Sequence, residues 1–94
     1  MATKLTKDPM QRIRWALEIL QLPHLVTKED IKRQYRYLSK QHHPDKGGSA
    51  ERMQEIAEAY AIIMEYIDRF RYRFDDDEIA TQFPGAEHAD RFKP

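Results

Sequence analysis

The stretch His42-His43-Pro44-Asp45-Lys46-Gly47-Gly48 separates two long amphipathic segments and decides how the chain folds. Proline has a fixed φ and no backbone N–H, so a helix that precedes Pro44 cannot run through it. The same ring pushes His43 out of the helical region toward an extended conformation. Gly47 and Gly48 then release the backbone. The sequence therefore predicts a helix end that presents an imidazole, a rigid ring and a carboxylate in succession.

The segment before this loop predicts an amphipathic helix that begins after Thr27 and runs to about Gln41. Thr27 is a good capping residue, and the two acids that follow it, Glu29 and Asp30, suit the first turn of a helix. The spacing of the apolar residues predicts which side chains face inward on this helix: Ile31, Gln34, Tyr35 and Leu38. Only one of Tyr35 and Tyr37 can face inward, because two positions on a helix are about 200° apart.

Basic residues share the outer face of the same helix. Three of them are four residues apart and so form one row along the helix: Lys32, Arg36 and Lys40. Arg33 widens this row, and the two acids of the helix both lie at its beginning. From charge alone the row is either a solvated face or a docking face.

The segment after the loop predicts a third helix, capped by Ser49. Its apolar stripe consists of Met53, Ile56, Ala57, Tyr60, Ile63, Met64 and Ile67. Neither glycine nor proline occurs between residues 49 and 83, so this helix either continues through Phe74 or bends near Glu65 into a fourth. The run 75–78, Asp-Asp-Asp-Glu, favours a new cap and a short helix through about Phe83.

A first helix is expected to begin with Asp8 as its cap and Pro9 at its first position, and to stop at Leu22-Pro23. The fold class is therefore all-α, a small bundle in which the second and third helices form an antiparallel hairpin, the first helix packs across them and a short C-terminal helix follows. The expected core consists of Ile13, Leu17, Leu20, Ile31, Leu38, Met53, Ile56, Tyr60 and Ile63, with Trp15 and Tyr66 also on apolar faces. The expected divisions are a tail over 1–8, the helical domain over 9–74, and a short helix and tail over 75–94.

The composition narrows the class of protein. The 94 residues carry no net charge and no cysteine, which excludes disulfides and thiolate metal sites. Residues 1–49 carry 10 basic and 5 acidic side chains, and residues 50–94 carry 6 and 11. Zero net charge argues against a general nucleic-acid binder but allows a local basic face. No apolar run is long enough to span a membrane, and the first residues lack the apolar centre of a signal peptide, so we expect a cytoplasmic protein. We also expect a monomer.

Four segments together resemble a known family. Residues 16–22 form the apolar segment of a first helix, residues 29–40 a basic second helix, and residues 55–60 an Ala-Tyr third helix. His43-Pro44-Asp45 lies between the last two. In this order and spacing, residues 14–74 resemble a J domain, the module named for the DnaJ co-chaperones. The chain departs from the family pattern at His42, at Tyr37 and in residues 68–73, where the fourth-helix motif survives only loosely.

The resemblance implies a function and a set of contact residues. J domains bind DnaK-type heat-shock chaperones and stimulate their ATP hydrolysis, and they carry no active site or cofactor for that chemistry. By similarity, His43, Pro44 and Asp45 act at the partner's nucleotide-binding domain and linker. Residues that would meet an acidic surface of the partner are Lys32, Arg33, Arg36, Lys40 and Lys46. Tyr35 would add an apolar contact beside them.

Other classes of function have weaker support in the sequence. A basic helix in a small helical domain could enter the major groove of DNA, which is the alternative to a co-chaperone. Adjacent histidines point apart, so His42 and His43 do not make a metal site without further ligands. An enzyme would need a nucleophile with its base or a metal centre, and the chain supplies neither pattern.

Overall fold

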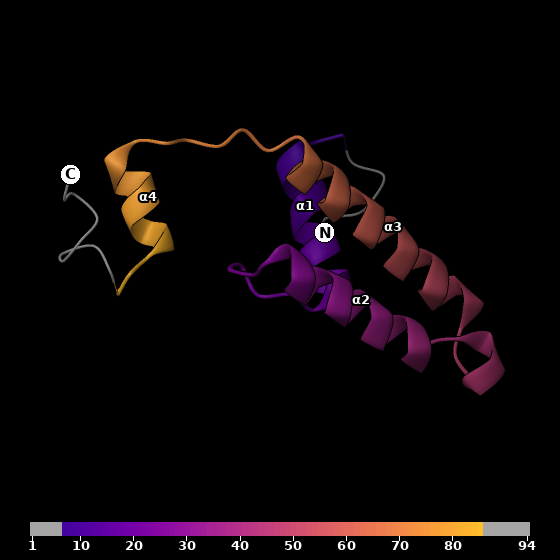
Figure 1. The fold of residues 1–94 in the computed structure, drawn as a ribbon. Helices are drawn as coiled ribbons and strands as arrows, with labels where there is room; N and C mark the ends of the chain where they lie inside the picture. The colour runs from indigo at the N-terminus through magenta and orange to yellow at the C-terminus, as the bar shows by residue number, and fades with distance from the viewer. Residues whose placement is uncertain (1–6, 86–94) are drawn as a thin grey trace.

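The computed structural model describes residues 7–85, and all regular structure in that range is helical (Figure 1). The elements are α1 (Pro9–Leu20), α2 (Lys28–Gln41), a short 3-10 turn η1 (Pro44–Lys46), α3 (Ala50–Asp68) and α4 (Asp76–Gln82). The predicted all-α fold class is confirmed. Within the described range, no helix is both long enough and apolar enough to cross a bilayer.

Side chains close to the helix ends fix the first two boundaries. Asp8 Oδ1 accepts the N–H of Met10 at 3.0 Å, as expected of a cap. Helix α1 ends at Leu20, two residues before the expected stop, because Gln21 adopts a left-handed conformation with φ 55°. The N–H of Gln21 then donates to Glu18 O and that of Leu22 to Leu17 O, the paired bonds of a Schellman motif.

Helix α2 begins with a reciprocal pair of hydrogen bonds. Thr27 Oγ1 accepts the N–H of Asp30 at 3.1 Å, and Asp30 Oδ2 accepts the N–H of Thr27 at 3.1 Å. The Asp30 carboxylate also accepts a bond from Arg33 Nη1 at 3.0 Å. These bonds, of which the one from the Thr27 N–H contributes most, lower the pKa of Asp30 below its ordinary value.

The core lies where α1 crosses the antiparallel pair α2–α3, and α1 packs most closely against α3 (Figure 1). The buried side chains are Trp15, Ala16, Leu20, Ile31, Leu38, Ile56, Ala59 and Ile63. Most of the predicted core is therefore confirmed as buried or packed against buried residues. Ala59 takes the place that the predicted stripe gave to Ala57, which is exposed because it lies about 100° around the helix from Ile56.

Two polar or amphipathic contacts join α2 to its neighbours. The rings of Tyr35 and Tyr60 are stacked, with centroids 4.0 Å apart and an interplanar angle of 13°. Gln34 Nε2 donates to the carbonyl oxygen of Leu20 at 3.0 Å, at the end of α1. The prediction that Gln34 faces inward is confirmed, and its amide satisfies one of the carbonyls that a helix end leaves unpaired.

The C-terminal part differs from both expectations for the third helix. Helix α3 neither continues through Phe74 nor bends near Glu65, but ends at Asp68. Most helix stability comes from packing of an apolar face, and residues 70–74 have no helix to cover them, so they run extended. Tyr66, predicted to be core, is half-exposed in the last turn of α3. The short helix α4 after Asp75 is confirmed, and it lies apart from the other three helices (Figure 1).

Candidate functional site

The loop between α2 and α3 is a closed turn that fixes the orientation of its side chains. His43 is extended, with φ −66° and ψ 133°, as the following proline requires. Its carbonyl oxygen accepts the N–H of Lys46 at 2.9 Å and that of Gly48 at 3.0 Å. Its Nδ1 accepts the N–H of Asp45 at 3.2 Å, so the imidazole caps the turn. Backbone and ring together hold Pro44, Asp45 and Lys46 in one 3-10 turn.

The two glycines have different roles in this turn. Gly47 has φ 82°, a left-handed conformation that other residues adopt only at a cost. Gly48 passes against the backbone of α2, and a Cβ added there would lie 2.2 Å from the carbonyl carbon and oxygen of His42. The sequence predicted a released backbone at both positions, but no sequence pattern indicated the close approach at Gly48.

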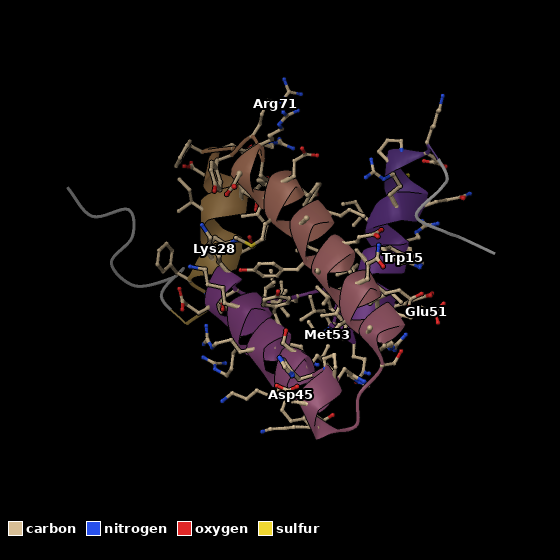
Figure 2. The ribbon with its side chains drawn as sticks, turned by 90° about the vertical axis from the view of Figure 1, so that its right-hand side faces the viewer. Trp15, Lys28, Asp45, Glu51, Met53 and Arg71 are labelled. Carbon is tan, nitrogen blue, oxygen red and sulfur yellow. The ribbon has the colours of Figure 1, made fainter. Side chains whose placement is uncertain are left out.

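The side chains of the turn face solvent. The side chain of His43 is 54% exposed and that of Asp45 is 88% exposed. Asp45 Oδ2 lies 3.6 Å from His43 Nδ1, which makes an ion pair only when the imidazole is protonated. Nδ1 can accept the N–H of Asp45 only when it carries no proton, so the hydrogen bond and the ion pair exclude each other. Figure 2 shows Asp45 at the end of the α2–α3 hairpin.

The predicted basic row lies on the outer face of α2, next to this turn. Arg36, Lys40 and Lys46 are exposed, and Lys32 is partly exposed. No carboxylate of residues 7–85 lies within ion-pair distance of these four groups. Arg33 differs from them, because its guanidinium is paired with Asp30 at 3.0 Å. We define the basic face as Lys32, Arg36, Lys40 and Lys46.

The two tyrosines of α2 lie on different sides of the helix. Tyr35, predicted to contact a partner, is half-buried and stacks on Tyr60, so only its outer edge is open to such a contact. Tyr37 is exposed, and its hydroxyl accepts a hydrogen bond from Gln41 Nε2 at 2.9 Å. The prediction that one of the pair is exposed is confirmed. Tyr37, an exposed aromatic side chain beside the basic face, was not among the predicted contact residues.

The arrangement presents an exposed surface that combines a carboxylate with a row of cations. Among residues 7–85, no three His, Asp or Glu side chains come together to hold a metal ion. His43 and Asp45 lie side by side on a convex turn, whereas catalytic pairs usually lie in a concave pocket. A fixed turn with an exposed carboxylate, adjoining an unpaired row of cations, is suited to contact with another protein's surface.

Comparison with known proteins gives one family. A sequence model described as the DnaJ domain matches residues 16–73. Proteins named "Chaperone protein DnaJ" are also similar to this chain. The one from Lysinibacillus sphaericus (strain C3-41) is 40% identical over 72 residues, which cover 73% of this chain and 18% of the relative. Those from Methanosarcina acetivorans and Geobacillus kaustophilus are 41% and 45% identical over 70 and 72 residues, covering 70% and 72% of this chain and 18% and 19% of the relatives. No solved structure gives a significant match. The chain thus spans less than a fifth of the length of these relatives.

Proposed function

The chain belongs to the DnaJ-domain family, and from this premise we propose that it binds a DnaK-type heat-shock chaperone and stimulates its ATP hydrolysis. Residues of the His43-Pro44-Asp45 turn make the contact that triggers hydrolysis, at the partner's nucleotide-binding domain and linker. The basic face orients the encounter. The chain contributes no group to the chemistry itself, and the partner supplies both nucleotide and active site.

The observation that carries this proposal is the exposed, rigid turn. Asp45 is not used to stabilise the fold, since its side chain is 88% exposed and, among the described residues, the only basic side chain within 4 Å of its carboxylate is His43, at 3.6 Å. The turn that holds it is nevertheless closed by four hydrogen bonds and by the close approach at Gly48. A rigid turn that holds an exposed side chain with no role in stabilising the domain supports a role for that side chain in binding a partner.

The basic face supports an electrostatic role in the encounter. A row of exposed cations raises the association rate and selects orientation more than it adds affinity. Lys46 connects the row on α2 to the turn, so both parts of the surface meet the partner together. Arg33 contributes less charge than the others, because Asp30 already pairs with it.

Stimulation of hydrolysis requires that docking favours one state of the partner. A bound protein shifts an equilibrium only by its differential affinity for the two states. We therefore assign the turn, rather than the basic face, to the state-selective contact. A fixed carboxylate can match one arrangement of cations and not another, whereas a row of flexible lysines cannot.

The test is the ATP turnover of a purified DnaK-type chaperone with and without this protein. Asp45→Asn removes the charge and keeps the shape, and loss of a desolvated charge pair costs about 2–5 kcal/mol, or roughly 30-fold or more in affinity. We expect Asp45→Asn and His43→Gln to abolish stimulation at a concentration where the native protein saturates it. Glu18→Gln, an equal charge change on an exposed face of α1, is the matched control. Circular dichroism should show unchanged helix content in all three, and undiminished stimulation by Asp45→Asn would refute the mechanism.

A further inference from the structure

A second surface lies at the other end of the molecule, where the start of α1 meets the end of α3. It is an open groove of about 860 Å³. Its apolar lining includes Ile13, Leu17, Ile63 and Ile67. Four arginines also line it, Arg12, Arg14, Arg69 and Arg71, together with one carboxylate, that of Glu65. All four guanidinium groups are exposed, and within the described part of the chain none has an ion-pair partner. The groove is therefore apolar at its base and strongly basic around it.

The same chain carries a segment with the opposite properties. Tyr72 is 70% exposed, Phe74 is 80% exposed, and Phe83 is also exposed. Between these aromatic residues lies the acidic first turn of α4, with Asp76, Asp77 and Glu78. In this part of the chain, residues 72–83, helix α4 lies away from α1–α3 (Figure 1), and the Tyr72 ring packs edge-on against Phe70 at the edge of the groove, with centroids 5.6 Å apart.

We propose that the groove of one copy binds residues 72–83 of a second copy, and that the exchange is reciprocal, giving a dimer with two-fold symmetry. The aromatic side chains enter the apolar base, and the carboxylates of α4 pair with the arginines around it. The observation behind this assignment is the double match of the two surfaces, apolar to apolar and acidic to basic. A closed, reciprocal exchange is the usual form of homodimer, and exchange of a terminal element is a common route to it.

Helix capping alone does not explain this segment. Acidic residues in a first turn stabilise any helix, and Asp75 caps α4 by accepting the N–H of Glu78 at 2.9 Å. That accounts for the acids but not for the exposed aromatic side chains on both sides of them. Contiguous exposed apolar surface on a small protein usually marks an interaction site. The two features together call for a partner surface that is both apolar and basic, which this chain itself provides.

The chain path favours a second copy over the same molecule. Phe70 and Arg71 themselves line the groove, so the segment leaves directly from its edge. The backbone then runs outside any helix to Asp75, and α4 lies away from α1–α3 (Figure 1). A segment directed outward from its own groove is placed to enter that of a neighbour.

The area is of the size that a dimer needs. Aromatic side chains bury about 150–250 Å² each. Three of them from each copy, counted with the groove surface that they cover, bury surface of the order of the roughly 1,200–2,000 Å² found in specific interfaces. The His43-Pro44-Asp45 turn stays free in this dimer, because the 19 residues of α3 separate the two ends by about 28 Å.

The test is the molecular mass of the full chain in solution, measured by sedimentation over a range of concentrations up to about 1 mM. We expect the mass of two chains for the native protein. Asp76→Lys with Asp77→Lys, and separately Arg69→Glu with Arg71→Glu, should each give the mass of one chain. An equimolar mixture of the two double variants should restore the dimer, because both exchanged pairs are then complementary again. Glu18→Lys with Glu51→Lys, exposed acids outside the groove, should leave the dimer intact.

Two outcomes would overturn the proposal. One is a single-chain mass for the native protein at every concentration, which would leave the groove to the protein's own segment or to another protein. The other is a dimer that neither double variant weakens, which would place the interface elsewhere. Stimulation of a DnaK-type ATPase is measured in parallel, and the groove variants should retain it, so failure of the dimer is distinguishable from failure of the proposed function.

Discussion

The molecule has two basic surfaces, one along the outer face of α2 up to the loop and one around the groove at the end of α3, and they differ in what lies beneath the charge. Figure 2 shows the two ends of the α2–α3 hairpin, with Asp45 at the loop end and Arg71 at the other. The basic face of α2 lies on the outside of a helix, with its apolar side chains turned inward. The arginines at the other end surround an apolar groove.

This difference predicts two kinds of interaction. Charges over a helix surface attract a partner quickly and release it quickly, and salt screens them over a Debye length of about 8 Å. Charges around an apolar groove add orientation to a contact that buries hydrocarbon, which is less sensitive to salt. The first suits an encounter that is repeated in each ATPase cycle, and the second suits a lasting contact.

The largest effect on ATPase stimulation is expected from a substitution at Gly48, which disrupts the turn between α2 and α3 without touching the groove. Gly48→Ala places a Cβ against the His42 backbone, so the closed turn must open. We expect stimulation of the partner's ATPase to be lost, and the groove end to keep its association state. Gly47→Ala is the matched control, because nothing lies within 4 Å of the added Cβ and only the left-handed φ is strained, at about 1 kcal/mol. Equal activity of the two variants would show that the turn tolerates rearrangement.

A charge reversal at each end compares the two surfaces directly. Lys32→Glu with Arg36→Glu should weaken binding to a DnaK-type chaperone at least tenfold at low salt and flatten its dependence on ionic strength, because the attraction has become a repulsion. Arg69→Glu with Arg71→Glu changes net charge equally and should leave that binding unchanged. Calorimetric titration at two salt concentrations measures both. A salt dependence that persists in the α2 variant would assign the contact to another face.

Most of the fold could be predicted from the sequence because its boundaries depend on local chemistry. Thr27, Ser49, Asp75 and Pro44 each act through bonds to their immediate neighbours, and each appears in the structure at the predicted helix end. The end of α3 could not be predicted. Neither glycine nor proline marks it, and it depends on where packing against another helix stops.

The candidate site was predictable in position but not in its supporting contacts. The exposed turn and the basic face follow from Pro44 and from a four-residue spacing. The stacking of Tyr35 on Tyr60 and the approach of Gly48 to His42 depend on how α2 and α3 meet, which no local pattern specifies. The groove could not be predicted from the sequence, because three segments that are far apart in the sequence line it. Its apolar residues have the same helical spacing as core residues and were therefore predicted to be core.

Acid should weaken the cap at the start of α2, where Asp30 accepts its hydrogen bonds. The hydrogen bond from the Thr27 N–H, with those of the Thr27 hydroxyl and Arg33, lowers the pKa of Asp30 in the folded protein. A lowered folded-state pKa contributes stability above the unfolded pKa, near pH 4, and this is lost as the pH falls through the folded value. Asp30→Asn should therefore be less stable than the native protein at pH 7, and the difference should shrink below about pH 4. Urea unfolding at several pH values tests this, with Glu29→Gln as the control of equal charge. A difference that stays constant down to pH 2 would mean that the charge of Asp30 is not the cause.

The smallest effects are expected from alanine substitutions at two serines near the loop. One substitution should raise the free energy of unfolding and the other should lower it. Ser39 Oγ is buried with no hydrogen-bond partner among the described residues, so Ser39→Ala removes an unsatisfied group and replaces serine with a better helix former. Ser49 Oγ accepts the N–H of Arg52 at 3.1 Å and caps α3, so Ser49→Ala should cost about 1 kcal/mol. We expect Ser39→Ala to raise the free energy of unfolding by about 0.5–1 kcal/mol, measured by urea denaturation. If Ser39→Ala instead destabilises the protein as much as Ser49→Ala does, the Ser39 hydroxyl has a hydrogen-bond partner in solution. Water would then reach the α2–α3 contact at the loop end, although the neighbouring Leu38 is buried.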